Sequence, residues 1–382
     1  MNILFVQWNS IGQQDLEEAF ILEGHKLLCV NFSHNELQQG NLSKIERELL
    51  QLVKSGKPDI VFTVDYFPYI TTFCSCHKLR YVSWVYDSPH DAMYSEEIVN
   101  PCNTVYTLDK ETCLEFRRAG ISTVRYLPMA ANTDRMNKNA IDLPFSYDVS
   151  FVGALYLEKD YFTTRLDILT DYTRGYIDAL VAAQVKIWGY NFIEESLQPV
   201  LDDLKRVYPW VPINKGDLRS DTYFYTQVLI NPWLTAVERI DLLDAVAEHY
   251  TVDFFTHSKD FSLPNLRNHG YADYYKKAPQ VFKQSKINLN ISYRGIKSAV
   301  PLRCFDIMGA GGFLLSNYQS GFLDLFVPDE DFVFYENKKD LVQKIGYYLE
   351  HESERQSIAQ NGYDKVAANH TYRHRVKEML DL

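Results

Sequence analysis

The stretch Ser285–Asn317, SKINLNISYRGIKSAVPLRCFDIMGAGGFLLSN, decides the fold. Lys286–Asn290 has the alternating apolar pattern of a strand, and a polar loop with one glycine follows over Ile291–Val300. Pro301 suits the first turn of a helix, where its missing N–H is no loss, so Leu302–Met308 is predicted to be helical. A glycine-rich segment then ends that helix before a second buried strand.

Two charged residues of that helix, Arg303 and Asp306, share one face because they are three positions apart. The start of a helix offers free N–H groups and a positive dipole end, which suit an anion. A cation in the first turn is unfavourable for the helix itself, so we expect Arg303 to face an anion or a carboxylate. Asp306, one turn deeper, can bind vicinal hydroxyls. The spacing predicts a sugar-phosphate or nucleotide site and, equally, an ordinary turn with a surface ion pair.

Composition limits the class of protein. The chain has 382 residues, enough for two or three domains, with 46% hydrophobic and 23% charged residues, as in ordinary globular proteins. A formal net charge of −11 argues against a general nucleic-acid binder. No apolar run reaches the length of a membrane-spanning helix. The first residues, MNILFVQW, predict a core strand rather than a signal peptide.

The six cysteines are scattered, and several lie in hydrophobic runs, which predicts reduced thiols and a cytoplasmic location. Cys74 and Cys76 precede His77 in a spacing that resembles a metal site. No second ligand pair with finger-like spacing accompanies them, so we expect no metal there.

Strands that alternate with helices through short turns predict a parallel sheet over residues 1–140, a Rossmann-like domain. Ala130–Phe145 loses periodicity and is interpreted as a linker. A second Rossmann-like domain is expected over 147–365, with a helical insertion at about 160–230 and a possible strand at Val185–Trp188. The last stretch, 366–382, is predicted to be a helix that returns to the first domain. The expected fold class is α/β, with two such domains facing each other across a cleft.

Three stretches carry a family resemblance: Tyr81–Ser95 continuing over Tyr106–Asn132, then Leu234–Ser258, then the opening stretch continued by Asp340–Arg375. Their order and spacing resemble CgeB-type (spore-maturation-protein-like) glycosyltransferases of GT-B fold. The resemblance implies transfer of a sugar from a nucleotide donor. It places the donor mainly on the C-terminal domain and the acceptor mainly on the N-terminal one.

The resemblance also assigns roles within the opening stretch. Retaining enzymes of this fold often carry two glutamates eight positions apart, the first on the donor sugar and the second on the ribose hydroxyls. Here Asp306 occupies the second position, and Ser298 occupies the first. That departure leaves the sugar contact, and retention of configuration, open.

Donor candidates come from four segments of the C-terminal half. For the diphosphate we expect Arg303 and backbone N–H groups beside it to act together. Arg239 is a second phosphate candidate or, nearly as well, half of a surface pair with Glu238. Tyr156 can stack on a base, or its segment is a plain strand-to-helix turn. The full set of expected donor-binding residues is Gly153, Tyr156, Arg239, Lys297, Ser298, Ala299, Val300, Leu302, Arg303 and Asp306, with Arg294 as a weaker candidate.

Candidates for acid–base chemistry follow strands of the N-terminal half. Asp87 and His90 follow the strand Arg80–Trp84, although Asp87 equally suits a turn before Pro89. Asp15 is a further candidate base, and capping of the first helix is the favoured alternative. His370 is expected in the last helical stretch as a solvated or capping residue, with a place in the lining of the cleft as the alternative.

Together with this resemblance, the sequence predicts a hexosyltransferase-like glycosyltransferase. It is expected to move a sugar from a nucleotide-sugar donor, UDP-linked, to a glycan or protein acceptor. No cofactor is expected beyond that substrate, and no metal, because no Asp-x-Asp follows a strand where it would hold the diphosphate. The alternatives are a catalytically silent nucleotide-binding or scaffolding protein of this fold, and an epimerase or hydrolase of nucleotide sugars. Sequence leaves the oligomeric state open.

Overall fold

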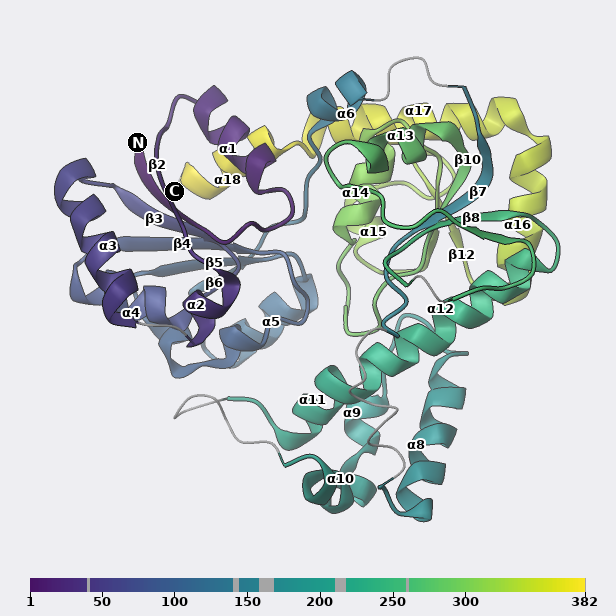
Figure 1. Ribbon diagram of the computed structural model, residues 1–382, viewed down its shortest axis with the longest axis horizontal. Coiled ribbons are helices and arrows are strands. Elements are labelled where there is room, and N and C mark those ends of the chain that lie inside the picture. Colours follow the sequence, from purple (N-terminus) through teal and green to yellow (C-terminus); the bar gives the residue numbers. More distant parts are fainter. Residues whose placement is uncertain (40–41, 140–143, 158–167, 210–217, 259–260, 382) are drawn as a thin grey trace. The chain divides into compact units, whose positions relative to one another are not determined.

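The computed structural model describes residues 1–39, 42–139, 144–157, 168–209, 218–258 and 261–381 (Figure 1). Its contacts divide into two units. Unit 1 holds residues 1–130, Leu218 and residues 370–381, and unit 2 holds the described residues of 131–211 and 219–369. Each unit contains one six-stranded sheet in which all neighbouring strands are parallel. Two parallel sheets with helices between their strands confirm the predicted α/β class.

The sheet of unit 1 has the order β2-β1-β3-β4-β5-β6. Its strands are β1 (Asn2–Gln7), β2 (Lys26–Asn31), β3 (Ile60–Val64), β4 (Arg80–Val85), β5 (Asn103–Thr107) and β6 (Val124–Tyr126). Its helices are α1 (Gln13–Leu22), α2 (His34–Gln39), α3 (Leu42–Gly56), α4 (Pro68–Cys76), α5 (Lys110–Arg118) and α18 (Tyr372–Leu380), with short 3₁₀ turns η1 (Asp91–Tyr94) and η2 (Glu96–Val99). The central strands are continuous apolar runs because helices cover both of their faces.

The last helix, α18, packs against α1 in unit 1. The sequence predicted one helix over residues 366–382, but this range contains the end of α17 (Glu352–Asn369) and the whole of α18, with a break at His370 and Thr371. The break forms because Thr371 starts α18 with a capping box: its side chain and that of His374 satisfy backbone groups at the helix start. His370 therefore lies between helices, where its Nδ1 is 2.6 Å from a guanidinium nitrogen of Arg375.

Glu23, just after α1, anchors α18 through Arg373 (2.6 Å) and Lys377 (3.4 Å). The hydrogen bond from Arg373 holds the pKa of the Glu23 carboxyl below its ordinary value. A lowered pKa means that the carboxylate stabilises the folded state above the ordinary pKa of Glu, about 4.3, and that this contribution disappears as the pH falls further. Both cations are about half exposed, so solvent screening keeps the contribution below about 1 kcal/mol.

We expect Glu23→Gln to lower the protection of the α18 amides against hydrogen exchange by less than about fivefold at neutral pH, the equivalent of that energy. At a pH well below the lowered pKa of Glu23 the variant and the wild type should exchange alike, because the wild-type carboxyl is then protonated. An unchanged difference at low pH would show that the effect is not electrostatic.

The sheet of unit 2 has the order β12-β11-β10-β7-β8-β9. Its strands are β7 (Tyr147–Val152), β8 (Val252–Phe255), β9 (Leu266–Asn268), β10 (Ser285–Asn290), β11 (Leu314–Asn317) and β12 (Val333–Tyr335). Its helices are α6 (Thr133–Asn139), α8 (Asp171–Gln184), α9 (Ile193–Ser196), α10 (Leu201–Val207), α11 (Asp221–Tyr225), α12 (Asn231–Ala247), α13 (Lys277–Gln284), α14 (Leu302–Gly309), α15 (Phe322–Leu325), α16 (Lys338–Glu350) and α17, with the 3₁₀ turn η3 (Gln198–Val200) and the π-helical turn η4 (Thr226–Ile230).

Helix α12 belongs to two hydrophobic cores. Its first half contributes Leu234 to a helical core formed with α8–α11, and its second half contributes Leu242 and Val246 to the core under the sheet. Figure 1 shows α8–α11 grouped at one end of α12. The predicted helical insertion is therefore present, and the possible strand at Val185–Trp188 is wrong, since those residues follow α8 without pairing in the sheet.

Two further details differ from the sequence prediction. The expected linker after Ala130 contains α6, a short helix that packs on α13. The edge strand β9 has only three residues, too few for a periodic pattern, and was not predicted. Among the described residues, no helix is long and apolar enough to cross a membrane.

In each sheet, the side on which successive strands are added reverses at one point along the chain. In unit 1 the chain runs from β1 to β2 on one side and then to β3 on the other, and in unit 2 β7 is followed by β8 on one side and β10 on the other. The loops at the carboxyl ends of strands flanking such a switch point form a crevice where open α/β sheets bind ligands. The candidate residues are located below relative to these two places.

Candidate functional site

Arg239 lies at the switch point of unit 2. It comes from α12, and its guanidinium donates hydrogen bonds to the carbonyl of Ala154, after β7, and to the carbonyl of Ile291, after β10 (Nε 3.1 Å, Nη2 2.6 Å). The side chain is 8% exposed, so the alternative of a surface pair with Glu238 is wrong. Burial lowers the pKa of Arg239, and the charge of Arg303 lowers it further. Arg303 is therefore among the charges that act on Arg239 at the carboxyl edge of this sheet.

Gly153 and Tyr156 surround the same guanidinium. Arg239 lies over the ring of Tyr156, 5.1 Å from its centroid, and Tyr156 packs against Tyr293 at 5.1 Å between ring centroids. Tyr156 has a φ of 61°, an uncommon backbone conformation for a bulky side chain. A Cβ at Gly153 would lie 3.1 Å from the Phe151 ring, tighter than most carbon contacts. The structure therefore brings together three of the predicted donor residues, Gly153, Tyr156 and Arg239.

Buried residues and a backbone hydrogen bond hold the loop before α14 in place. Ser298, Ala299 and Val300 are buried, and the carbonyl of Ser298 accepts a hydrogen bond from the N–H of Gly321 at 2.9 Å. Pro301 is the cap residue just before α14, and Leu302 is the first helical residue, as the sequence predicted. Lys297 is partly buried in this loop. These residues present the start of an eight-residue helix, as expected, next to the strand ends.

Arg303 and Asp306 both lie in α14 and face elements that precede β10. The guanidinium of Arg303 lies 5.5 Å from the ring centroid of Phe282 in α13. Asp306 is 1% exposed, and its Oδ1 accepts a hydrogen bond from the Tyr274 hydroxyl at 3.2 Å. The carboxylate is thus held in one orientation before any ligand binds.

Arg294 has a different role from the phosphate contact considered for it. Its guanidinium forms two hydrogen bonds of 2.7 Å to the two carboxylate oxygens of Glu238. It also donates to the carbonyl of Ile187, after α8, at 2.9 Å. The two side chains are 9% and 1% exposed. Arg294 therefore ties the helical part of unit 2 to α12 and neutralises the buried Glu238.

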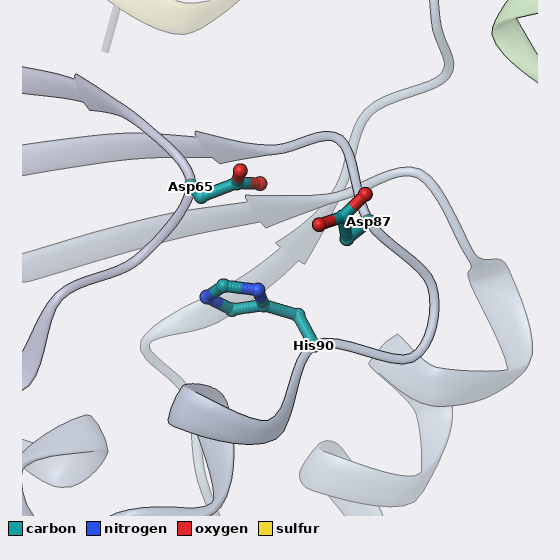
Figure 2. Close-up of side chains that lie close together, drawn as sticks. All are labelled: Asp65, Asp87 and His90. Atoms are coloured by element: carbon teal, nitrogen blue, oxygen red, sulfur yellow. The ribbon is translucent and has the colours of Figure 1, made fainter. Parts of the chain in front are cut away.

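Three side chains converge at the carboxyl edge of the unit 1 sheet: Asp65 after β3, and Asp87 and His90 after β4 (Figure 2). One atom of each lies within 4.8 Å of the others. Asp65 and His90 are buried, and Asp87 is exposed. The structure thus brings the predicted pair Asp87 and His90 together and adds Asp65, which sequence reasoning missed.

Burial raises the pKa of the Asp65 carboxyl to about 6, and the nearby carboxylate of Asp87 adds to that increase. His90 and the backbone N–H groups of Tyr86 and Asp87 act in the opposite direction. The N–H of Tyr86 donates to Oδ1 of Asp65 at 2.8 Å, which fixes the carboxylate. The signal that could have found Asp65 is its place directly after the buried run IVFTV, the same reasoning that pointed to Asp87.

Asp15 does not occupy the cap position that was favoured for it. Gly12 precedes α1 with a φ of 76°, and Asp15 is the third residue of the helix and buried. A Cβ at Gly12 would collide with the Tyr372 hydroxyl, so only glycine fits this turn. The role of Asp15 as a base stays a prediction.

A groove of about 780 Å³ lies elsewhere in unit 2, between α8, α12 and α16. Its walls combine apolar side chains such as Val237 and Leu242 with charged ones such as Asp241 and Lys338. None of the predicted donor residues lines it. The six cysteines, Cys29, Cys74, Cys76, Cys102, Cys113 and Cys304, are all free thiols.

A family model matches the C-terminal part of the chain. Residues 239–381 match the family model described as glycosyl transferase-like, a range that begins at Arg239 and includes α14. The comparison with curated proteins found none that matches this chain.

Solved structures show the fold of the whole chain. A glycosyltransferase from Rickettsia africae has a TM-score of 0.55 at 12% identity, covering 100% of this chain and 97% of its own. Sucrose-phosphate synthase from Thermosynechococcus elongatus has a TM-score of 0.54 at 12% identity, covering 99% and 97%. Anabaena HepE in complex with UDP and glucose has a TM-score of 0.52 at 11% identity, covering 100% and 99%. The fold is therefore the GT-B fold, as the sequence resemblance implied.

Proposed function

We propose that this protein is a glycosyltransferase that moves a sugar from a nucleotide-sugar donor, UDP-linked, to a glycan or protein acceptor. The observation that carries the proposal is the buried cation Arg239 at the switch point of the unit 2 sheet, at the start of the segment that matches a glycosyl transferase-like family. A diphosphate leaving group needs such charge next to it as the bond to the sugar breaks. The CgeB-like resemblance supports the same reaction.

The donor site is assigned to unit 2. Arg239 and Arg303 neutralise the diphosphate together with the N–H groups at the start of α14, so binding of the nucleotide needs no metal. Arg239 keeps further N–H groups for phosphate oxygens, because its two carbonyl partners use only part of a guanidinium with five donors. Tyr156 supplies an aromatic face beside the same site. UDP is the first nucleotide to test because HepE was solved with UDP and glucose.

The acceptor side is assigned to unit 1. Proton removal from an acceptor hydroxyl requires a base, and Asp87 and His90 are the candidates for it, with Asp65 beside them. Whether the configuration at the sugar is retained depends on contacts near Ser298, where the family resemblance leads one to expect an acid.

Thermal unfolding with UDP, GDP and UDP-sugars tests the donor proposal. We expect a stabilising shift with UDP and UDP-sugars that persists in EDTA. No shift with any nucleotide would overturn the proposal. Release of UDP from a panel of donors then separates the alternatives: release that requires a glycan extract indicates transfer, release without it indicates hydrolysis, and binding without release indicates a silent binding protein.

Asp306 is proposed to bind the ribose hydroxyls of the donor. We expect Asp306→Asn to weaken UDP binding roughly tenfold, the value of one hydrogen bond to a charged group, measured by calorimetry. The sharper readout compares UDP with 2′-deoxy-UDP and 3′-deoxy-UDP. If the carboxylate binds a ribose hydroxyl, removal of that hydroxyl should weaken binding to the wild type and have little further effect in Asp306→Asn.

Tyr274→Phe is the matched control, because it removes the hydroxyl that donates to Asp306 but leaves the carboxylate in place. It should preserve discrimination between UDP and its deoxy analogues. An Asp306→Asn protein that still discriminates as strongly as the wild type would contradict the ribose assignment.

A further inference from the structure

Asp65, Asp87 and His90 come from two neighbouring strand ends rather than from one sequence motif. β3 and β4 are paired in the sheet, and Asp65 follows the first while Asp87 and His90 follow the second. No Asp-x-Asp motif contains them, because the pairing of β3 with β4 and not a local sequence pattern brings them together. The three residues all belong to unit 1, whereas the residues assigned to the donor belong to unit 2.

The ligand atoms of the three side chains surround a common centre. Figure 2 shows both carboxylates and one ring nitrogen of His90 directed toward the same region. Their ligand atoms lie within 4.8 Å of one another, but in the part of the chain that the structure describes no hydrogen bond or ion pair joins the three side chains. Three points no more than 4.8 Å apart share a centre at most about 2.8 Å from each, since 4.8 divided by √3 is about 2.8. Metal–oxygen and metal–nitrogen bonds of about 2.0–2.6 Å need only a small contraction from there.

His90 is oriented as a ligand would be. Its Nε2 is 2.9 Å from the Tyr66 carbonyl oxygen and 3.3 Å from the Tyr66 backbone nitrogen. The shorter contact favours an Nε2–H group that donates to the carbonyl, which leaves the lone pair on Nδ1. Metal-binding histidines are held in this way, by a backbone carbonyl that accepts from the other ring nitrogen. The ring is 9% exposed, and no hydrogen bond to Nδ1 is seen among the described residues.

The negative charge of the cluster is not matched by lysine or arginine. Across the described ranges, neither Asp65 nor Asp87 forms an ion pair with a basic side chain, although Asp65 is 2% exposed. Two carboxylates close together, one of them buried, repel each other unless a proton or a cation lies between them. Two carboxylate oxygens and one imidazole nitrogen form a ligand set for a divalent ion such as Mn²⁺.

We propose that Asp65, Asp87 and His90 form a binding site for one divalent metal ion. The exposed carboxylate of Asp87 closes onto the ion, while Asp65 and His90 are held in place by Tyr86 and Tyr66. Three protein ligands leave coordination positions for water or for a hydroxyl of the acceptor, and while Asp87 and His90 hold the ion they do not act as the general base proposed above. This site is independent of the donor diphosphate, whose charge is met by arginines of unit 2.

The test uses the full chain, freed of metal by dialysis against EDTA and titrated with MnCl₂ without nucleotide. Free Mn²⁺ is followed by its electron paramagnetic resonance signal. We expect one Mn²⁺ per chain in the wild type and at least a tenfold loss of affinity in Asp87→Asn. Asp87 is the first choice because an exposed side chain can be changed without unfolding the protein, and His90→Gln should give a similar loss.

Glu96→Gln is the control, since Glu96 is an exposed acid of unit 1 outside the cluster. It should bind Mn²⁺ like the wild type. The proposal is overturned if the wild type binds no Mn²⁺, Zn²⁺ or Mg²⁺ at millimolar concentration, or if Asp87→Asn binds them unchanged. Binding of Zn²⁺ instead of Mn²⁺ with the same dependence on Asp87 supports the site. Because no nucleotide is present, failure here leaves the result of the UDP experiments unaffected.

Discussion

Replacing Arg294 by alanine should destabilise unit 2 by about 3–5 kcal/mol, the usual cost of removing one partner from a buried ion pair. The variant leaves the Glu238 carboxylate buried without the two hydrogen bonds that it accepts from Arg294. It also removes the donor to the Ile187 carbonyl, and with it a link between the helical part and α12. Chemical denaturation monitored by circular dichroism measures the loss.

The pH dependence identifies the cause. Burial already raises the pKa of Glu238 in the wild type, against the effect of Arg294. Without Arg294 the carboxyl should bind a proton more readily still, so the destabilisation of Arg294→Ala should shrink as the pH falls through that raised pKa. A loss of stability in Arg294→Ala that does not change with pH would indicate lost packing instead of an unpaired charge.

Two variants complete this experiment. Lys338→Ala breaks an exposed ion pair with Asp241, also on α12, and should cost less than about 1 kcal/mol. Replacing both partners, Glu238→Leu with Arg294→Met, should recover much of the loss because no unpaired charge remains. If Arg294→Ala is no worse than Lys338→Ala, the buried pair does not stabilise the fold as described.

The second large effect is expected at Arg239. Arg239→Met keeps an extended side chain but removes the charge, and it should weaken UDP binding by roughly 10- to 150-fold, which corresponds to a charged hydrogen bond of about 1.5–3 kcal/mol. Part of the loss will come from the Ala154 and Ile291 carbonyls, which lose their donor and no longer hold the two loops together. Calorimetry measures the affinity, and thermal unfolding checks that the variant is folded.

Arg267→Met is the matched control for this experiment, because Arg267 is an exposed arginine of the edge strand β9 in the same unit. It should leave UDP affinity within about twofold of the wild type. A folded Arg239→Met protein with wild-type affinity for UDP would remove Arg239 from the donor site.

The sequence predicted the fold well where apolar runs repeat. The runs ILFV in β1 and IVFTV in β3 have the composition of strands covered on both faces, and their spacing by helices fixed the parallel order. Likewise Arg303 and Asp306 lie in one short helix, because a spacing of three is a local property. The local sequence pattern was sufficient to predict both the parallel strands and this helix.

Partners that are distant in sequence could not be predicted in this way. A pair of Glu238 with its neighbour Arg239 was one of two interpretations, but successive helical residues point in different directions. The partner of Glu238 is Arg294, in a loop after another strand. Asp65 joins Asp87 and His90 only because β3 and β4 are adjacent in the sheet. The break before α18 depends on side-chain capping by Thr371 and His374, which the continuous polar and apolar pattern of this region conceals.

The register of β7 with β8 has a consequence for how the chain folds. Val149 pairs with Val252, so these adjacent strands close a loop of roughly one hundred residues that contains α8–α11. Closure of so long a loop is slow when the chain inside it is unstructured. Because the helices within the loop have a hydrophobic core of their own, they can collapse locally and bring α12 back toward β7. Folding of the helical part is thus expected to precede, and to accelerate, assembly of the sheet that carries the donor site.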